Sequence, residues 1–256
     1  MISLRAVTKT FGGGASYALQ DVSFDVAAQT FVAVVGDSGS GKTTLLKTIN
    51  RLIEPDTGEV FVAGEPARTS PAHSLRRHIG YVFQGIGLFP HMSIAENIGI
   101  TPRLIGWPEP VIRARVEELI DLVSLPRAFL TRLPAELSGG QRQRVGIARA
   151  LAARPGILLM DEPFGALDPV TRDALGAECR RLHETMRLTT VMVTHDILEA
   201  VLLADRIVVM RQGRIVADGE PHSLLTGHPD PAVSMLMDMP RRQAARVRAL
   251  LEERAP

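Results

Sequence analysis

A glycine-rich stretch has the residue types and spacing that hold phosphate groups. It consists of Gly36, Asp37, Ser38, Gly39, Ser40, Gly41, Lys42, Thr43 and Thr44. Glycines let the backbone curl so that successive N–H groups point inward, and the positive end of the following helix adds to this anion-binding hollow. We expect Lys42 to reach the terminal phosphates and Thr43 to place a hydroxyl on Mg²⁺. The expected ligand is a nucleoside triphosphate.

Two adjacent carboxylates form a second group of reactive side chains. Asp161 and Glu162 directly follow a short apolar run at residues 157–160, which is typical of a buried strand. Because one strand would place both carboxylates beside the phosphates, we expect each carboxylate to have a different role. Asp161 would hold Mg²⁺ through water, and Glu162 would accept a proton from the attacking water.

Gln84 and His195 also stand at the ends of apolar runs. Gln84 closes the run 79–83 and is placed to touch metal or attacking water, although such a residue alone is more often an ordinary strand end. His195 follows the run 190–193, at the carboxyl edge of the sheet where ligands of open α/β sheets gather. We expect His195 to contact the γ-phosphate, with a structural histidine as the alternative.

A second anion site is expected at the start of a later helix, which opens with Leu137, Ser138, Gly139, Gly140 and Gln141. Ser138 is a natural N-cap, and the two glycines behind it expose N–H groups at a positive helix end. Arg142, Arg144 and Arg149 add positive charge, although a solvated helix face has the same pattern.

Two loops contain large apolar or aromatic side chains, and each loop has two possible roles. An aromatic residue in the loop 11–17 is a candidate to stack on a purine; we prefer Phe11, with Tyr17 second, and packing on the sheet is an equal alternative. The loop 86–92 contains Leu88, Phe89 and Met92. Such a loop is either a satellite of the core or an exposed docking surface.

The elements that position these residues are read from periodicity. Alternation predicts half-exposed strands at 2–7 and 22–26, whereas apolar runs predict buried strands at 30–35, 79–83, 157–160 and 190–193. An edge strand is expected at 59–62, and a hairpin around Gln212 and Gly213.

Between residue 85 and about residue 153 the pattern changes to helices alone. One of these helices has an apolar stripe of Ile112, Val116, Leu119, Ile120 and Val123. We therefore predict an α/β fold with a mixed sheet and an N-terminal antiparallel β-subdomain. The core spans 1–84 and 154–237, a helical subdomain is inserted at 85–153, and a helical tail at 238–256 packs on the domain.

Composition is that of an ordinary globular protein. The chain has 256 residues, 45% of them apolar, and 29 basic residues nearly cancel 28 acidic ones. Nothing therefore indicates a nucleic-acid partner. The single cysteine, Cys179, has helical spacing with apolar residues, so we expect it in the core and a reducing compartment around the protein. No apolar run approaches 18 residues, so the chain is expected neither to span a membrane nor to be exported.

The phosphate loop, Gln84, Asp161 with Glu162, His195 and above all residues 137–141 together resemble the ATP-binding subunits of ABC transporters. The resemblance covers residues 1 to about 237. It implies ATP and Mg²⁺ as cofactors, Gln84 as the Q-loop glutamine that binds metal, Asp161 as the metal-holding aspartate and Glu162 as the catalytic glutamate. It also implies that residues 166–168 are the D-loop and that His195 is the switch histidine.

The same resemblance implies partners. Ser138, Gly139 and Gly140 of one subunit would close over ATP held by Lys42 of another in a head-to-tail homodimer. Transmembrane permease subunits would hold the dimer at the cytoplasmic face of the plasma (inner) membrane.

A narrower resemblance lies in residues 84–92, in Glu96-Asn97-Ile98 and in residues 104–107. It is similar to importers of osmoprotectants and quaternary amines such as glycine betaine, choline or carnitine, which implies a solute-binding protein as a further partner. Longer members of that group carry a paired regulatory module after the ATPase, and we do not expect one here. Asp37 and the Gln29-Thr30 turn depart from the family pattern, and neither replaces a catalytic group.

Other functional classes differ in how well the sequence fits them. Motifs leave room for an importer or exporter of another substrate. A soluble ATPase acting on DNA or ribosomes would carry a long coiled-coil insertion or a second cassette together with a basic face, and neither is evident. A small-molecule kinase or GTPase would have no use for Ser138, Gly139 and Gly140, and the guanine-reading motif of GTPases is absent from the sequence.

Overall fold

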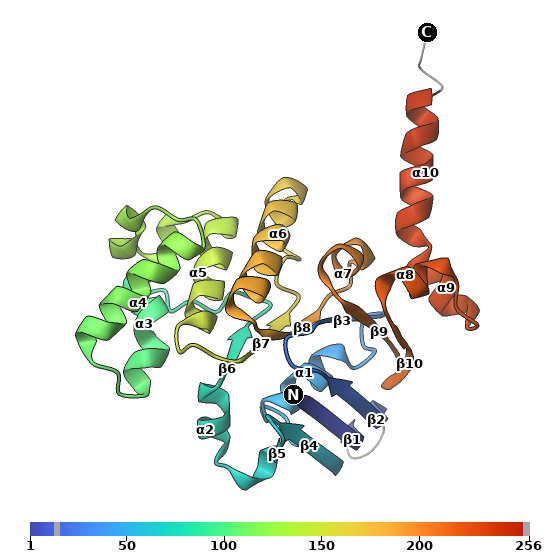
Figure 1. The fold of residues 1–256 in the computed structure, drawn as a ribbon, viewed down its shortest axis with the longest axis horizontal. Helices are drawn as coiled ribbons and strands as arrows, with labels where there is room; N and C mark the ends of the chain where they lie inside the picture. The colour runs from blue at the N-terminus through green and yellow to red at the C-terminus, as the bar shows by residue number, and fades with distance from the viewer. Residues whose placement is uncertain (13–15, 253–256) are drawn as a thin grey trace.

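The computed structural model describes residues 1–12 and 16–252, which form two β-sheets with helices around them (Figure 1). The first sheet is antiparallel, in the order β2-β1-β4-β5, and its strands are β1 (Ile2–Phe11), β2 (Ser16–Val26), β4 (Thr57–Val62) and β5 (Glu65–Pro66). This is the predicted N-terminal antiparallel sheet. The strand expected at the edge, β4, is not the outermost one, because the short β5 pairs with it.

The second sheet is mixed, as predicted, in the order β10-β9-β3-β8-β7-β6. Its strands are β3 (Phe31–Val35), β6 (Ile79–Val82), β7 (Ile157–Asp161), β8 (Thr189–Val193), β9 (Arg206–Arg211) and β10 (Arg214–Gly219). Neighbours are parallel except β9 and β10, which form the predicted hairpin. The run expected as a buried strand at 79–83 forms the edge strand β6; Ile79 and Val82 are buried, but Phe83 is exposed.

The helices are α1 (Lys42–Ile49), α2 (Ala72–Arg77), α3 (Ile94–Leu104), α4 (Glu109–Leu122), α5 (Gly139–Leu151), α6 (Pro169–Met186), α7 (Ile197–Leu203), α8 (Pro221–Thr226), α9 (Pro231–Met237) and α10 (Met239–Glu252). Short 3₁₀ helices occupy Ala67–Thr69, Arg127–Thr131 and Pro134–Glu136. The predicted apolar stripe of α4 is buried, and α3, α4 and α5 gather at one end of the molecule (Figure 1).

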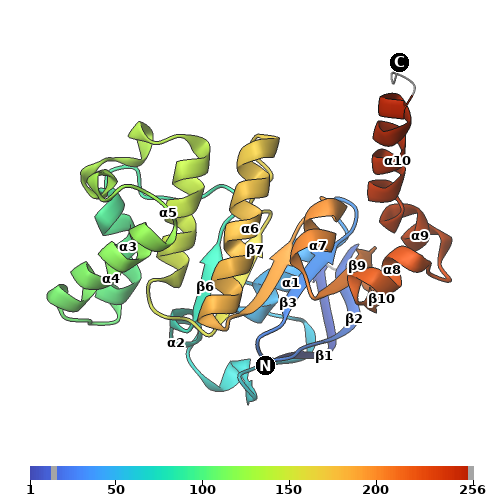
Figure 2. The same cartoon turned by 45° about the horizontal axis from the view of Figure 1, so that its top comes forward.

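The central strand β3 separates two hydrophobic cores. Ala33 and Val35 pack on the side of α4 to α7, whereas Val32 and Val34 pack with α1 and the antiparallel sheet. Figure 2 shows α5, α6 and α7 side by side over one face of the mixed sheet. Because side chains alternate along a strand, a run that is apolar throughout is buried on both faces. Cys179 of α6 lies in the first core, as expected.

The tail forms a helix but does not pack as predicted. In Figures 1 and 2 α10 points away from the body of the protein, and the side chains of residues 241–246 are exposed. Residues 241–246 are Arg-Arg-Gln-Ala-Ala-Arg, which offer no large apolar side chain to bury. Arg242 instead pairs with Asp238, which directly precedes α10.

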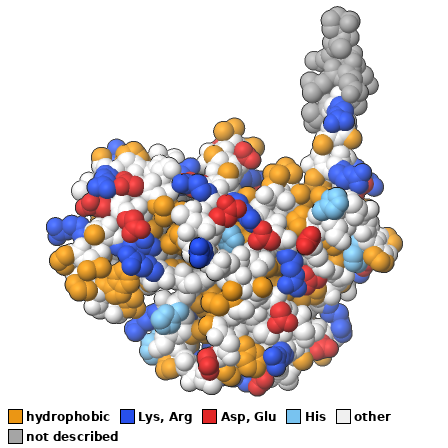
Figure 3. All heavy atoms as spheres, in the orientation of Figure 1, with side chains coloured by type: hydrophobic (Ala, Val, Ile, Leu, Met, Phe, Trp, Pro, Cys, Tyr) orange, Lys and Arg blue, Asp and Glu red, His pale blue; other side chains and the backbone are white. Residues whose placement is uncertain are grey.

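The surface agrees with the near-zero net charge. Figure 3 shows basic and acidic side chains interspersed over the visible face rather than gathered in one stripe. Within residues 1–12 and 16–252, no helix combines the length and the apolar composition needed to cross a bilayer.

Candidate functional site

The glycine loop joins β3 to α1 and depends on its glycines. Gly36, Gly39 and Gly41 have φ of 143°, 79° and 102°, in the region that favours glycine. A Cβ on Gly36 would lie 2.1 Å from the carbonyl oxygen of Met210, and a Cβ on Gly41 would lie 2.0 Å from that of Ala18. The loop is therefore wedged between β9 and β2, and two of its glycines permit that close approach.

The other side of the loop has room and donors for an anion. A Cβ on Gly39 would meet nothing within 4 Å. The hydroxyl of Ser40 is buried and has no hydrogen-bond partner among the described residues. Lys42 Nζ donates to the carbonyl oxygens of Gly36 and Asp37, 2.7 and 2.8 Å away. Spare buried donors of this kind fit phosphate oxygens.

Lys42 is a buried ammonium group, with 6% of its surface exposed. Burial lowers its pKa, an effect opposed by the carboxylates of Glu162, Asp37 and Asp161. Its hydrogen bonds to two carbonyl groups satisfy the ammonium but do not neutralise its charge. A phosphate would do both. The Asp37 and Ser38 side chains are exposed.

The two residues expected at Mg²⁺ lie together. Thr43 Oγ1 donates to Asp161 Oδ1 across 2.9 Å, at the point where α1 begins and β7 ends. A hydroxyl and a carboxylate provide the hard oxygen ligands that suit Mg²⁺, which keeps most of its other positions for water and phosphate. This donor set fits the ion.

Tyr81 also reaches Asp161, the residue expected to hold Mg²⁺, a contact that the sequence did not reveal. The Tyr81 hydroxyl donates to Asp161 Oδ2 across 3.3 Å. Burial and the neighbouring Asp161 raise the pKa of Tyr81, so the phenol stays protonated and remains a donor. Its position in the edge strand β6 gave no signal of this role, because the pairing of β6 with β7 is a long-range feature.

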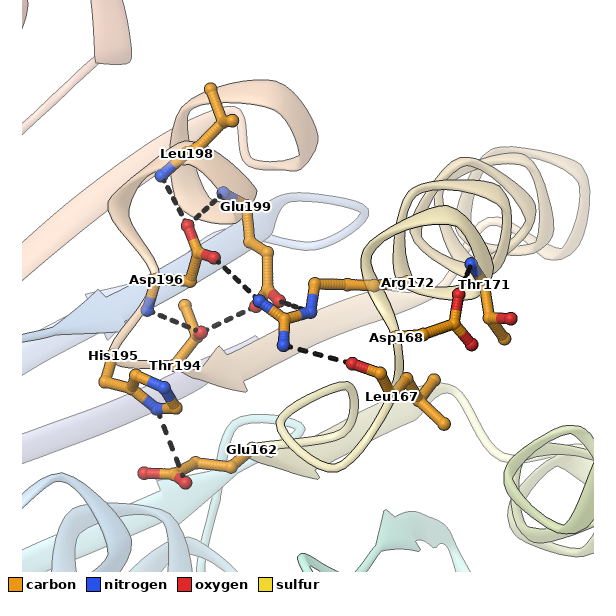
Figure 4. Close-up of polar contacts among 10 residues, drawn as sticks. All are labelled: Glu162, Leu167, Asp168, Thr171, Arg172, Thr194, His195, Asp196, Leu198 and Glu199. Atoms are coloured by element: carbon orange, nitrogen blue, oxygen red, sulfur yellow. Dashed lines mark hydrogen bonds and ion pairs between the residues drawn. The ribbon is translucent and has the colours of Figure 1, made fainter. Parts of the chain in front are cut away.

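Glu162, Gln84 and His195 converge although they come from three segments of the chain. Gln84 Nε2 donates to Glu162 Oε2 across 3.0 Å. His195 Nδ1 lies 3.5 Å from the same oxygen, and Figure 4 shows this second contact. Glu162 has φ of 44°, an uncommon conformation for a residue with a side chain. Its N–H donates to Val193 O, 2.9 Å away, which ties it to the strand leading to His195. Gln84 thus contacts the carboxylate expected to act as base, whereas Thr43 contacts Asp161, the carboxylate expected to hold Mg²⁺.

The Ser138, Gly139 and Gly140 segment begins α5, and Ser138 is its N-cap as expected. Ser138 Oγ accepts from Gln141 N across 3.3 Å, and Gln141 Oε1 accepts from Ser138 N across 2.9 Å. Gln141 is therefore occupied by the cap. In Figures 1 and 2 α5 and α1 lie apart on either side of β7, so the two expected anion sites do not meet within one chain.

The arginines of α5 are not a solvated cationic face. Arg142 donates to Leu137 O, 2.8 Å away, and Arg144 pairs with Glu178 of α6. Arg149 is 8% exposed and donates to the carbonyl oxygens of Ile86 and Gly87, 2.9 and 2.6 Å away. These side chains tie α5 to Leu137, to α6 and to the loop 86–92.

The loop 86–92 is part core and part surface. Leu88 packs against the core, whereas 40% of the surface of Phe89 is exposed. Asn97, which is fully buried, accepts from Phe89 N and donates to the carbonyl oxygens of Phe89, Met92 and Ser93. The loop therefore presents Phe89 from a fixed backbone.

Both candidate aromatic residues lie at the end of the β1–β2 hairpin. Phe11 and Tyr17 are 47% and 52% exposed, and Ala18 beside Tyr17 touches the phosphate loop at Gly41. Either ring remains available to a purine. Residues 13–15 of the expected loop 11–17 lie outside the described residues.

Comparison with known proteins assigns this arrangement to a family. A family model described as ABC transporter matches residues 19–165, more than half of the chain. The chain belongs to the ABC transporter family. The match includes the phosphate loop, the Ser138 segment, Asp161 and Glu162, while His195 lies beyond it.

Relatives of this ABC transporter chain include two bacterial proteins. It is 49% identical to the choline transport ATP-binding protein OpuBA of Bacillus subtilis (strain 168), over 91% of this chain and 61% of that protein. It is 50% identical to the glycine betaine uptake system ATP-binding protein YehX of Escherichia coli (strain K12), over 88% of this chain and 73% of that one. The chain thus spans about three fifths of the length of OpuBA.

A solved structure has the same fold. It is a dimer of the ATP-binding cassette MJ0796 in a post-hydrolysis state, bound to ADP and Pi. The two chains are 35% identical with a TM-score of 0.78, over 86% of this chain and 98% of that one.

Proposed function

We propose that this chain binds ATP with Mg²⁺ and hydrolyses the ATP as the motor subunit of an ABC transporter. The observation that carries the proposal is the convergence of Gln84, Glu162 and His195, with Glu162 Oε2 3.0 Å from Gln84 Nε2 and 3.5 Å from His195 Nδ1. A carboxylate next to a buried lysine and a hydroxyl–carboxylate pair has the groups that phosphoryl transfer to water requires.

Each residue has a distinct role in this mechanism. The N–H groups of residues 36–43 and Lys42 bind the phosphates, while Thr43 and Asp161 hold Mg²⁺, with Gln84 as a third candidate. The ion supplies charge neutralisation at the phosphate oxygens. Glu162 accepts the proton of the attacking water, and His195 contacts the γ-phosphate. Phe11 or Tyr17 stacks on the adenine.

A second copy of the chain completes the site. The Ser138 segment lies apart from the phosphate loop in one chain, with Ser138 exposed and Gly139 and Gly140 half-buried, so that it can cover phosphates of another chain. We infer that the segment closes over the nucleotide of the partner in a head-to-tail homodimer. The dimeric state of the MJ0796 cassette supports this inference.

The transported solute is proposed from the relatives. OpuBA and YehX are ATP-binding proteins of choline transport and glycine betaine uptake. We infer import of an osmoprotectant or quaternary amine, with permease subunits at the cytoplasmic face of the membrane and a solute-binding protein outside. The exposed Phe89 is the proposed permease contact. A chain for another solute is the alternative, since this chain is also 45% identical to the sulfate/thiosulfate import protein CysA of Thermosynechococcus vestitus.

The hydrolysis proposal is tested with Glu162→Gln in the full chain. We expect this variant to bind ATP, to accumulate ATP-dependent dimers in size-exclusion chromatography and to hydrolyse ATP at least about 100-fold more slowly, because a general base is lost. Glu184→Gln changes an exposed carboxylate of α6 and serves as the control. Near-normal turnover of Glu162→Gln would place the base elsewhere.

The solute proposal is tested with the complete transporter in proteoliposomes. ATP hydrolysis should rise with a solute-binding protein loaded with glycine betaine or choline, and should not rise with one loaded with sulfate. If only the binding protein loaded with sulfate stimulates hydrolysis, the proposed solute class is wrong, while the ATPase proposal stands.

A further inference from the structure

Arg172 of α6 joins two segments that flank the proposed catalytic carboxylate. Its Nη2 donates to Leu167 O across 3.2 Å, and its Nη1 donates to Asp196 Oδ2 across 3.2 Å. Its Nε lies 3.6 Å from Glu199 Oε1 (Figure 4). One guanidinium group therefore contacts the turn after Glu162 and the first turn of α7 after His195.

The segment around His195 is ordered by the same network. Asp196 Oδ1 caps α7 by accepting from Leu198 N and Glu199 N, 2.9 and 3.2 Å away. Thr194 Oγ1 accepts from Asp196 N across 3.0 Å and donates to Glu199 Oε2 across 2.6 Å. Both chain neighbours of His195 are thus fixed by groups that Arg172 contacts.

Charge balance in the network depends on the guanidinium. The side chain of Glu199 is 10% exposed, and burial raises its pKa, while Thr194 and then Arg172 act to lower it. Without Arg172, the charged form of Glu199 would lose a compensating cation in a largely buried place. The hydrogen bond that Glu199 accepts from Thr194 would then weaken as well.

Contacts between α6 and α7 are apolar in the core and polar at the start of α7. Gly176 of α6 faces Leu203 of α7, and Leu175 and Ala200 lie in the same hydrophobic core. An open pocket of about 440 Å³ beside them is lined by Arg172 and Arg180. Arg172 thus supplies polar contacts from α6 to the start of α7, in addition to the apolar packing of Ile197. A cavity leaves space for movement when such a contact is removed.

Arg180 provides an internal comparison. It lies on the same face of α6 and also reaches the other side of the cavity, where its Nη1 donates to Leu203 O and Asp205 Oδ1, 2.9 and 2.7 Å away. Arg172 and Arg180 thus bridge the same pair of elements at opposite ends of α7. Arg172 is at the end that carries His195.

We propose that Arg172 is a positioning residue for hydrolysis, which ties the turn at Leu167 to the Thr194–Asp196 segment and thereby holds His195 against Glu162. The proposal rests on the proposed ATPase function. No hydrogen bond joins Arg172 to Glu162 or Lys42 among the described residues, and its contacts with Asp196 and Glu199 lie next to His195.

The test measures ATP hydrolysis by the full chain carrying Arg172→Gln, Arg172→Lys or Arg180→Gln. We expect Arg172→Gln to lower kcat about 10- to 100-fold with KM for ATP changed less than about twofold, because misplacement of a reacting group by an ångström has effects of that size. Arg172→Lys should recover part of the loss through its charge. Arg180→Gln should keep kcat within about twofold while lowering the melting temperature similarly.

A double-mutant cycle with His195→Ala separates positioning from a general structural role. If Arg172 acts through His195, adding Arg172→Gln to His195→Ala should lower kcat by less than about twofold further. Full additivity of the two losses would overturn the proposal, as would an equal loss of kcat in Arg180→Gln. Should Arg172→Gln fail to fold, Arg172→Lys enters the same cycle. If this cycle contradicts the role of Arg172 while Glu162→Gln hydrolyses ATP slowly as expected, the positioning proposal is wrong and the ATPase proposal stands.

Discussion

The hydroxyl of Thr43 donates a hydrogen bond of 2.9 Å to the carboxylate of Asp161, although 118 positions separate them along the chain. Thr43 is at the start of α1 and Asp161 at the end of β7, so the mixed sheet brings the phosphate loop and the carboxylate strand to one edge. Ligands of open α/β sheets gather at this edge, where the strands end. The hydrogen bond between Thr43 and Asp161 therefore marks the position expected for Mg²⁺.

Removing the Thr43 hydroxyl should weaken nucleotide binding only when Mg²⁺ is present. Thr43→Val keeps the side-chain shape but loses the oxygen ligand, so we expect the affinity for Mg²⁺–ATP to fall about tenfold or more, the size of a lost charge-assisted contact. Binding of ATP in EDTA should change less than about twofold. Isothermal titration calorimetry measures both, with Thr43→Ser as the control that keeps the hydroxyl. Equal losses with and without Mg²⁺ would contradict the metal role.

Local features of the site were predictable from the sequence because they depend on few neighbouring residues. The curl of the glycine loop and the N-cap of Ser138 are set by residues within about one turn of chain. The buried strands β3, β7 and β8 were predicted from their apolar runs, and the family resemblance linked the motifs into one site.

Features that depend on strand order or long-range pairing were not predictable. Placement of β6 at the sheet edge and the hydrogen bond from Tyr81 to Asp161 follow from which strands become neighbours. The roles of Arg149 and Arg172 were hidden because an arginine on a helix looks solvated until its partners are known. The tail was predicted to be a helix from its own residues, but its packing requires a complementary surface elsewhere.

Phe89 should couple ATP hydrolysis to the proposed permease subunits. The buried Asn97 fixes the backbone around Phe89, so Phe89→Asp changes an exposed ring without disturbing the core, whereas the same change at Leu88 would bury a charge. We expect Phe89→Asp to keep the ATPase rate of the isolated chain within about twofold and to abolish stimulation by reconstituted permease subunits. Val111→Asp, at an exposed apolar position of α4, is the matched control. Undiminished stimulation of Phe89→Asp would show that the permease binds elsewhere.

His183 should make the folded state sensitive to mild acid. The ring is 4% exposed, its Nδ1 lies 3.0 Å from Thr190 Oγ1, and it packs on Phe31 with ring centroids 5.2 Å apart. Burial, and then the charge of Arg180, lower the pKa of His183 below its ordinary value of 6.5. The unfolded chain therefore binds a proton at a higher pH than the folded chain does.

The sign of the effect follows from this difference in proton binding. Above about pH 6.5 His183 is neutral in both states, and its contribution to stability is complete; as the pH falls from 6.5 toward the lowered pKa, only the unfolded state gains the proton. The free energy of unfolding should then fall by at most about 1.4 kcal/mol per pH unit from this group. Urea unfolding between pH 7.5 and pH 5.5 should show a smaller decline in His183→Gln than in the parent chain, even though the variant is less stable at pH 7.5. His73→Gln, at an exposed position of α2, should keep the parental decline, and parallel declines in all three proteins would refute the role of His183.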